Sequence, residues 1–141
     1  MSVTIYHNPD CGTSRNTLAM IRESGVAPEV IEYLVTPPDN ATIMQMVSDA
    51  GLTLRQALRQ KGTPYAELGL DDPAITDAEL LDAIAANPIL LNRPFVVTPR
   101  GTRLCRPSEV VLEILENPDI GPFTKEDGEV VNTGGPGLTA R

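Results

Sequence analysis

A chain of 141 residues has the length of one ordinary domain, and its 41% hydrophobic and 21% charged residues are typical of a globular protein. The formal net charge of −8 argues against non-specific nucleic-acid binding, which depends on Lys and Arg displacing counterions from phosphates. No apolar run approaches the roughly 20 residues of a membrane span, and the N-terminus has no secretion signal, so we expect a cytoplasmic protein without membrane contacts.

The chain opens with an alternation of strand and helix. Residues 3–6 form a β-branched and aromatic run typical of a strand, and the turn-forming cluster 7–10 follows it. From Thr13 the apolar spacing is helical, and Gly25 stands at the C-cap. A second strand is predicted over residues 29–34. This order is the unit from which parallel sheets are built.

The middle of the chain is predicted to be helical. One helix is expected at about 40–50 and a short one at 54–59. Thr76 and Glu79 form a Ser/Thr-x-x-Glu capping box, which predicts that a third helix begins here and runs to about residue 86.

The next elements are a predicted hairpin and a last helix. Residues 95–97 and 102–105 indicate two short strands around the turn-forming residues 99–101. Pro107 is expected in the first turn of a helix over about 108–116, where proline is well tolerated.

This order of elements predicts an α/β fold with a four-stranded mixed sheet. We expect one domain over residues 1–131, with a helical insertion between the second and third strands at about 39–88. The Gly- and Pro-rich residues 132–141 are predicted to form a flexible tail.

The two cysteines stand far apart in the sequence. A secreted disulfide scaffold would contain more cysteine, and a structural zinc site would need more closely spaced ligands, so no metal is expected. Cys105 follows the apolar Leu104 in a predicted strand and is expected to be a buried thiol without a chemical role.

Cys11 stands where the first strand gives way to the first helix. Free N–H groups and the dipole of a helix N-terminus favour negative charge, so this position lowers a thiol pKa and attracts an anion. Gly12 allows a close approach of the backbone, and Thr13 and Ser14 add hydroxyl donors. Lowering the pKa by about two units takes about 2.7 kcal/mol. Because the dipole contributes only about 0.3–1 kcal/mol, nearby cations must help.

Candidate cations come from several parts of the chain. They are His7, Arg15, Arg59, Arg93 and Arg106. The Arg93-Pro94 pair comes just before the third predicted strand. In folds where a reactive cysteine follows the first strand, this position lies beside the helix N-terminus, and a cis bond at Pro94 is compatible with it. Arg15 is left out of the catalytic set because an arginine is common at a solvent-exposed position of a helix.

Three separated motifs closely resemble those of the arsenate reductases of the ArsC family. They are residues 7–16 (HNPDCGTSRN), 88–94 (PILLNRP) and 103–108 (RLCRPS). The resemblance extends to about Val131. It implies a thioredoxin-like fold with a helical insertion, arsenate as substrate, no bound cofactor, glutathione as co-substrate and glutaredoxin as partner.

The resemblance also implies a role for each matched residue. The thiolate of Cys11 would attack arsenate and form a covalent thioarsenate, which glutathione and glutaredoxin would reduce to arsenite in arsenic detoxification. The oxyanion would be bound by Arg59, Arg93 and Arg106, and the thiolate would be tuned and supported by His7, Gly12, Thr13 and Ser14.

Two other functions of the same fold stay open on the sequence. One is a glutathione-dependent thiol reductase of another substrate, which would keep Cys11 but would not need three arginines. The other is a redox-linked regulatory protein that binds RNA polymerase and senses oxidation through the disulfide of a Cys-x-x-Cys motif. Here Ser14 stands at the second cysteine position, so that disulfide cannot form.

Overall fold

The computed structural model describes residues 2–131, and the contacts divide the chain into two compact units. One unit combines Met1–Ile31 with Arg93–Arg141, and the other is Glu32–Asn92. The helical insertion predicted at about 39–88 falls inside the second unit. The tail predicted at 132–141 lies outside the described residues.

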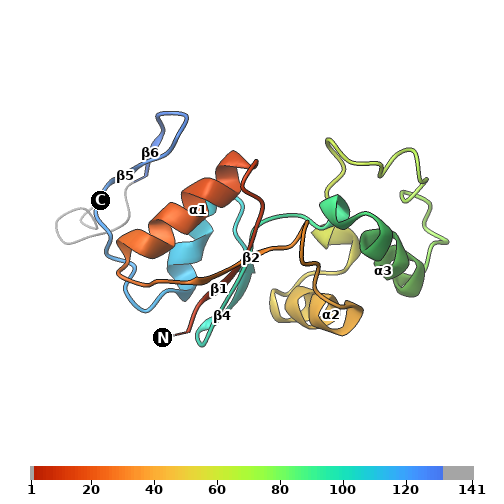
Figure 1. Ribbon diagram of the computed structural model, residues 1–141, viewed down its shortest axis with the longest axis horizontal. Helices are drawn as coiled ribbons and strands as arrows, with labels where there is room; N and C mark the ends of the chain where they lie inside the picture. Colours follow the sequence, from red (N-terminus) through yellow and green to blue (C-terminus); the bar gives the residue numbers. More distant parts are fainter. Residues whose placement is uncertain (1, 132–141) are drawn as a thin grey trace. The chain divides into compact units, whose positions relative to one another are not determined.

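A four-stranded sheet with the order β2-β1-β3-β4 forms the framework of the first unit (Figure 1). Its strands are β1 Thr4–His7, β2 Glu29–Glu32, β3 Phe95–Thr98 and β4 Gly101–Leu104. Strand β3 pairs antiparallel with both β1 and β4. Strand β2 follows β1 after a crossover through a helix, the kind of connection that joins parallel strands. The predicted four-stranded mixed sheet is confirmed.

Two helices pack together in this unit, α1 Gly12–Glu23 and the 3₁₀ helix η3 Ser108–Ile114 (Figure 1). After α1, Gly25 takes a φ of 92°, the positive value that glycine adopts most easily past a helix end. The core of the unit consists of Val3, Ile5, Leu18, Met20, Ile21, Val96, Cys105, Val111, Ile114, Leu115 and Val131.

The last predicted helix differs from the expectation in its position and form. It ends at Ile114, and Pro107 is its N-cap rather than a residue of its first turn. Its buried residues are Ser108, Val111 and Ile114, one in every three. Because a 3₁₀ helix has three residues per turn, this spacing places all of them on one face.

A hairpin that the sequence did not predict follows η3. Strands β5 Phe123–Thr124 and β6 Val130–Val131 pair antiparallel. Val131 is buried in the core of the unit. Lys125 is buried in the turn and forms ion pairs with Glu109 of η3 at 2.9 Å and with Glu129 at 3.0 Å, which ties the hairpin to the rest of the unit.

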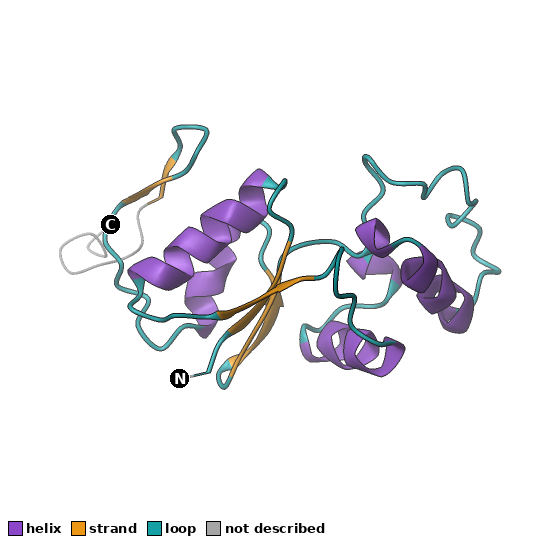
Figure 2. Cartoon of the chain, in the orientation of Figure 1, coloured by secondary structure: helices purple, strands orange, loops and turns teal. Residues whose placement is uncertain are grey.

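The second unit is built of helices and loops (Figure 2). Its elements are α2 Asn40–Asp49, η1 Arg55–Ala57, α3 Asp77–Ala86 and η2 Pro88–Leu90. The predicted capping box of Thr76 and Glu79 is present at the start of α3. None of the helices among residues 2–131 is long and apolar enough to cross a membrane.

The short helix predicted at 54–59 is wrong in extent. Only a single 3₁₀ turn forms at Arg55–Ala57, because Leu58 is extended and pairs with Leu91. The side chain of Arg55 donates to three backbone carbonyls of the following loop, those of Leu70, Asp72 and Ile75.

Candidate active site

Cys11 is the N-cap residue of α1 and only 8% of its surface is exposed. Its N–H donates to the carbonyl of Asn8 at 3.0 Å, which closes a tight turn after β1. Its own carbonyl accepts the N–H of Arg15 at 2.9 Å, the first hydrogen bond of the helix. The turn and the helix therefore fix the backbone of Cys11 from both sides.

The hydroxyl of Ser14 organises the buried side of this turn. Its oxygen lies 2.6 Å from Nδ1 of His7 and accepts the N–H of Asn8 at 3.1 Å. All three residues are buried, and Ser14 is completely inaccessible. The backbone N–H of Ser14, rather than its hydroxyl, is the group of this residue that lowers the pKa of Cys11.

Two arginines reach Cys11 from the ends of adjacent strands. Nη1 of Arg106 lies 3.8 Å from the sulfur and donates to the carbonyl of Arg93 at 3.1 Å. The side chain of Arg93 also hydrogen-bonds the sulfur, and its Nε and Nη1 atoms are buried. The peptide bonds that follow both arginines, to Pro94 and Pro107, are cis.

The register of the sheet explains why these groups meet. Phe95 at the start of β3 lies opposite Leu104 at the end of β4, and it also lies opposite Tyr6 near the end of β1. The chain segments just outside these three positions therefore share one edge of the sheet. They carry Arg93, Arg106 and the turn that leads to Cys11.

The surroundings of Cys11 favour its ionised form. Burial raises the pKa of the thiol, but the hydrogen bonds from the Arg93 side chain and the Ser14 backbone oppose it. The charge of Arg93 and the hydrogen bond from Arg106 also lower the pKa, and the net result is a pKa below the ordinary thiol value. A thiolate at this position is the nucleophilic form of cysteine.

A comparison with known families gives the site its context. The sequence model of the family described as ArsC matches residues 6–114 of this chain. This chain belongs to the ArsC family. The membership predicted from three sequence motifs is therefore confirmed.

Similar proteins extend the ArsC match over nearly the whole chain. A Rhizobium meliloti protein named arsenate reductase is 67% identical over 131 residues, which cover 93% of this chain and 94% of the relative. An arsenate reductase of Escherichia coli K12 is 57% identical over 130 residues, 92% of each chain. The structure of an arsenate reductase from Vibrio cholerae is 45% identical, with a TM-score of 0.78 over 82% of this chain and 98% of that one. The predicted thioredoxin-like α/β fold is confirmed.

The remaining predicted site residues of this ArsC chain lie in different places. Gly12 and Thr13 form the first turn of α1 beside Cys11. Arg59 belongs to the second unit, where its Nε donates to the carbonyl of Lys61 at 3.2 Å, and its role in binding the oxyanion stays a prediction. Within residues 2–131, no group of three or more His, Cys, Asp or Glu side chains could hold a metal ion.

Cys105 has surroundings of the opposite kind. It lies one residue past the end of β4, not inside the strand as predicted, and it is fully buried in the core. Burial strongly raises the pKa of its thiol, the charge of Glu113 raises it further, and the charge of Arg103 opposes both. A thiol in this state is a poor nucleophile.

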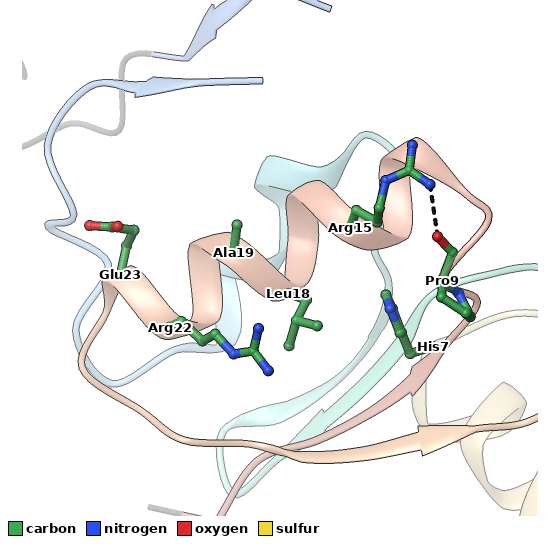
Figure 3. Close-up of a pocket in the computed structure, with 7 residues that line it drawn as sticks. All are labelled: His7, Pro9, Arg15, Leu18, Ala19, Arg22 and Glu23. Atoms are coloured by element: carbon green, nitrogen blue, oxygen red, sulfur yellow. Dashed lines mark hydrogen bonds between the residues drawn. The ribbon is translucent and has the colours of Figure 1, made fainter. Parts of the chain in front are cut away.

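A pocket of about 440 Å³ lies along α1 (Figure 3). It is lined by His7, Pro9, Arg15, Leu18, Ala19, Arg22 and Glu23, so it shares His7 with the surroundings of Cys11 but is not lined by the cysteine. In Figure 3 the side chain of Arg15 reaches the carbonyl of Pro9, to which its Nη1 donates at 2.7 Å.

Sequence reasoning missed two residues next to Cys11. Asn8 caps the turn, since its side-chain oxygen accepts the N–H of Asp10 at 2.9 Å. An Asn in the cluster before the cysteine is a recognisable signal for such a turn. Glu126 lies against the first turn of α1, and no local sequence signal indicates a contact across 111 residues.

Proposed function

We propose that this ArsC-family chain is an arsenate reductase that works through the thiolate of Cys11. The observation that carries the proposal is the pair of arginines at the sulfur. Nη1 of Arg106 lies 3.8 Å from it, and the side chain of Arg93 lowers the pKa of Cys11 by its hydrogen bond and its charge. A guanidinium is a planar donor that suits an oxyanion. One position thus combines a nucleophile with an anion-binding surface, which accords with the names of the similar proteins.

The proposed reaction begins with attack of the Cys11 sulfur on arsenic. A sulfur–arsenic bond forms, and one arsenate oxygen takes up protons and leaves as water, so arsenic remains As(V) in the thioarsenate. The thiol of glutathione then displaces a second oxygen, again as water. Both steps need a thiolate nucleophile and stabilisation of negative oxygen atoms.

Reduction follows when a glutaredoxin thiolate attacks the sulfur of the arsenic-bound glutathione. A disulfide forms between glutaredoxin and glutathione, the sulfur–arsenic bond to glutathione breaks, and its electron pair stays on arsenic, which becomes As(III). Water then releases arsenite from Cys11 and restores the thiol. No metal or bound redox cofactor takes part in this sequence, and a glutathione-coupled reaction suits the cytoplasm, where thiols are kept reduced.

Arg93 and Arg106 are proposed to act on both reactants of the first step, the Cys11 thiolate and arsenate. They stabilise the Cys11 thiolate before the reaction and can donate to the arsenate oxygens during it. Arg59 is proposed as the third oxyanion ligand on the strength of the family resemblance.

The polar residues behind the sulfur hold it in position. The Ser14 hydroxyl joins His7 to the turn, and the Ser14 backbone lowers the pKa of the Cys11 thiol. Gly12 and Thr13 contribute the free backbone N–H groups of the helix N-terminus, which favour an anion at this point. These residues are proposed to tune and support the nucleophile rather than to react.

The decisive experiment is a coupled assay of arsenate reduction with glutathione, glutaredoxin, glutathione reductase and NADPH. Wild-type protein should oxidise NADPH in an arsenate-dependent manner, Cys11→Ser should lose this activity, and Cys105→Ser should keep it. Absence of arsenate-dependent turnover in the wild type would reject the proposal and favour a thiol reductase of another substrate.

A further inference from the structure

The hairpin of β5 and β6 is fastened to the first turn of α1 by a two-point contact. Glu126, in the hairpin turn, accepts hydrogen bonds from Nε of Arg15 at 3.0 and 2.9 Å and from Nη2 at 2.8 Å. Its backbone N–H donates to Oδ1 of Asn16 at 3.1 Å. Two consecutive helix residues therefore hold the same residue of the hairpin.

Arg15 also holds the turn that carries Cys11. Its Nη1 donates to the carbonyl of Pro9 at 2.7 Å (Figure 3). Because Pro9 lies inside the turn closed by Asn8 and Cys11, one guanidinium links the hairpin, the helix and the turn. A Cβ added to Gly12 would lie 3.8 Å from Nη2 of Arg15, so the guanidinium sits beside the residue that follows the cysteine.

The contact between Arg15 and Glu126 orients the Arg15 side chain more than it stabilises the fold. The side chains of Arg15 and Glu126 are 43% and 49% exposed, and exposed ion pairs typically stabilise a fold very little. The Glu126 carboxylate binds the guanidinium of Arg15 at two nitrogens, which fixes the plane of the guanidinium. Only in a fixed orientation can the same group also donate to the Pro9 carbonyl. A simple surface ion pair would not need that third contact.

We infer that Arg15 is a positioning residue for Cys11, oriented by Glu126, and that the C-terminal hairpin is therefore a working part of the active site. The inference rests on the proposed role of Cys11 as the nucleophile. Glu126 acts through Arg15, and Arg15 acts through the turn at Pro9. Neither residue needs to touch the substrate.

The charged and titratable groups near Cys11 come from the strand ends, the turn and α1. Arg93 and Arg106 lie at the strand ends, His7 ends β1, and Asp10 lies in the turn. Hydrogen bonding to Glu126 raises the pKa of Arg15 against the effect of burial, and the charges of Glu126, Cys11 and Asp10 raise it further. Arg15 thus keeps its positive charge near the sulfur, while Glu126 offsets part of it.

The test compares Arg15→Lys, Arg15→Gln and Glu126→Gln with a matched surface pair. Arg103 and Glu113 form an ion pair of similar exposure, 40% and 61%, away from the Cys11 turn, so Arg103→Gln and Glu113→Gln remove the same charges elsewhere. Two quantities are measured: kcat/KM for arsenate, and the pH profile of Cys11 alkylation by iodoacetamide.

We expect both Arg15 variants and Glu126→Gln to lose about fivefold to tenfold in kcat/KM, with melting temperatures close to that of the wild type. Arg15→Lys keeps the charge but not the fork, so it should still shift the alkylation profile to higher pH. Adding Glu126→Gln to Arg15→Gln should cause no further loss. The matched variants should behave as wild type.

Unchanged kinetics and an unchanged alkylation profile in the Arg15 variants would overturn the inference, as would a further loss on adding Glu126→Gln to Arg15→Gln. The alkylation profile needs no arsenate. If the wild-type protein fails to reduce arsenate but the profile shifts as expected, the proposed function fails and the positioning role stands. If all variants reduce arsenate equally well and share the same alkylation profile, only the positioning role fails.

Discussion

The two cysteines of this chain are both buried, yet their surroundings differ in every other respect. Cys11 is 8% exposed and Cys105 is 0% exposed, so exposure alone barely separates them. Cys11 has charged and backbone donors aimed at its sulfur, whereas Cys105 lies among apolar side chains of the core. The pKa of Cys11 is lowered and that of Cys105 is raised. Reactivity therefore depends on what faces the buried sulfur, not on how deeply the sulfur is buried.

Removing Arg93 is the strongest way to make Cys11 resemble Cys105. Arg93→Ala takes away both a hydrogen bond to the sulfur and a nearby positive charge. Loss of one such donor to a reacting anion typically costs about 100-fold to 1,000-fold in rate, and we expect a loss of that size in kcat/KM for arsenate.

Steady-state kinetics of Arg93→Ala would be compared with those of Arg100→Ala, an exposed arginine at the opposite end of the β3–β4 hairpin. Arg100→Ala should retain wild-type activity. Equal kinetics for the two variants would show that the arginine beside the sulfur is not needed.

Ser14→Ala tests the polar support behind Cys11. The change leaves the buried N–H of Asn8 and Nδ1 of His7 without the serine oxygen that they contact. An unsatisfied buried polar group costs about 1–3 kcal/mol, so we expect a loss of that size in the free energy of unfolding by urea. The backbone N–H at position 14 remains, so Cys11 should still be alkylated below the ordinary thiol pKa.

The exposed Ser48 of α2 provides the control, because Ser48→Ala removes the same hydroxyl at the surface. Its free energy of unfolding should stay within about 0.5 kcal/mol of the wild type. A Ser14→Ala protein as stable as this control would refute the role of the buried hydroxyl.

The smallest expected effect is a difference in how stability depends on pH. A lowered folded-state pKa stabilises the fold above the unfolded thiol value of about 8.5, and this stabilisation is lost as pH falls through the folded-state pKa of Cys11. The raised folded-state pKa of Cys105 acts in the opposite sense. Its contribution to the free energy of unfolding is present below about pH 8.5 and is lost as the pH rises above that value.

Urea unfolding across this pH range would separate the two contributions. The stability of the wild type relative to Cys11→Ser should increase with pH, and its stability relative to Cys105→Ser should decrease above the ordinary thiol pKa. Two slopes of the same sign would contradict the contrast between the two thiols.

Much of the Cys11 site was accessible from the sequence because its signals are local. A cysteine at the start of an expected helix, with Gly12 after it and a turn-forming cluster before it, indicated an anion-binding position. The capping box at Thr76 likewise marked the start of α3 correctly. The convergence of Arg93 and Arg106 was expected from the family resemblance, and the register of β3 against β4 explains it physically.

The features that sequence reasoning missed depend on tertiary contacts. Strands β5 and β6 have two residues each, too few for an alternating pattern to appear. The partner of Arg15 lies 111 residues away, so its pairing is invisible until the hairpin folds back. Leu58 was expected to be helical, but its pairing with Leu91 outweighs the local preference.

The most direct test of this account is the rate of iodoacetamide alkylation as a function of pH, measured on Cys105→Ser and Cys11→Ser proteins. Cys105→Ser retains only Cys11, and the midpoint of its rate profile should lie below the ordinary thiol pKa, as expected for a stabilised thiolate. Cys11→Ser should react only when the protein unfolds. An inflection for Cys11 at or above the ordinary thiol pKa, or ready alkylation of folded Cys11→Ser protein, would contradict the account.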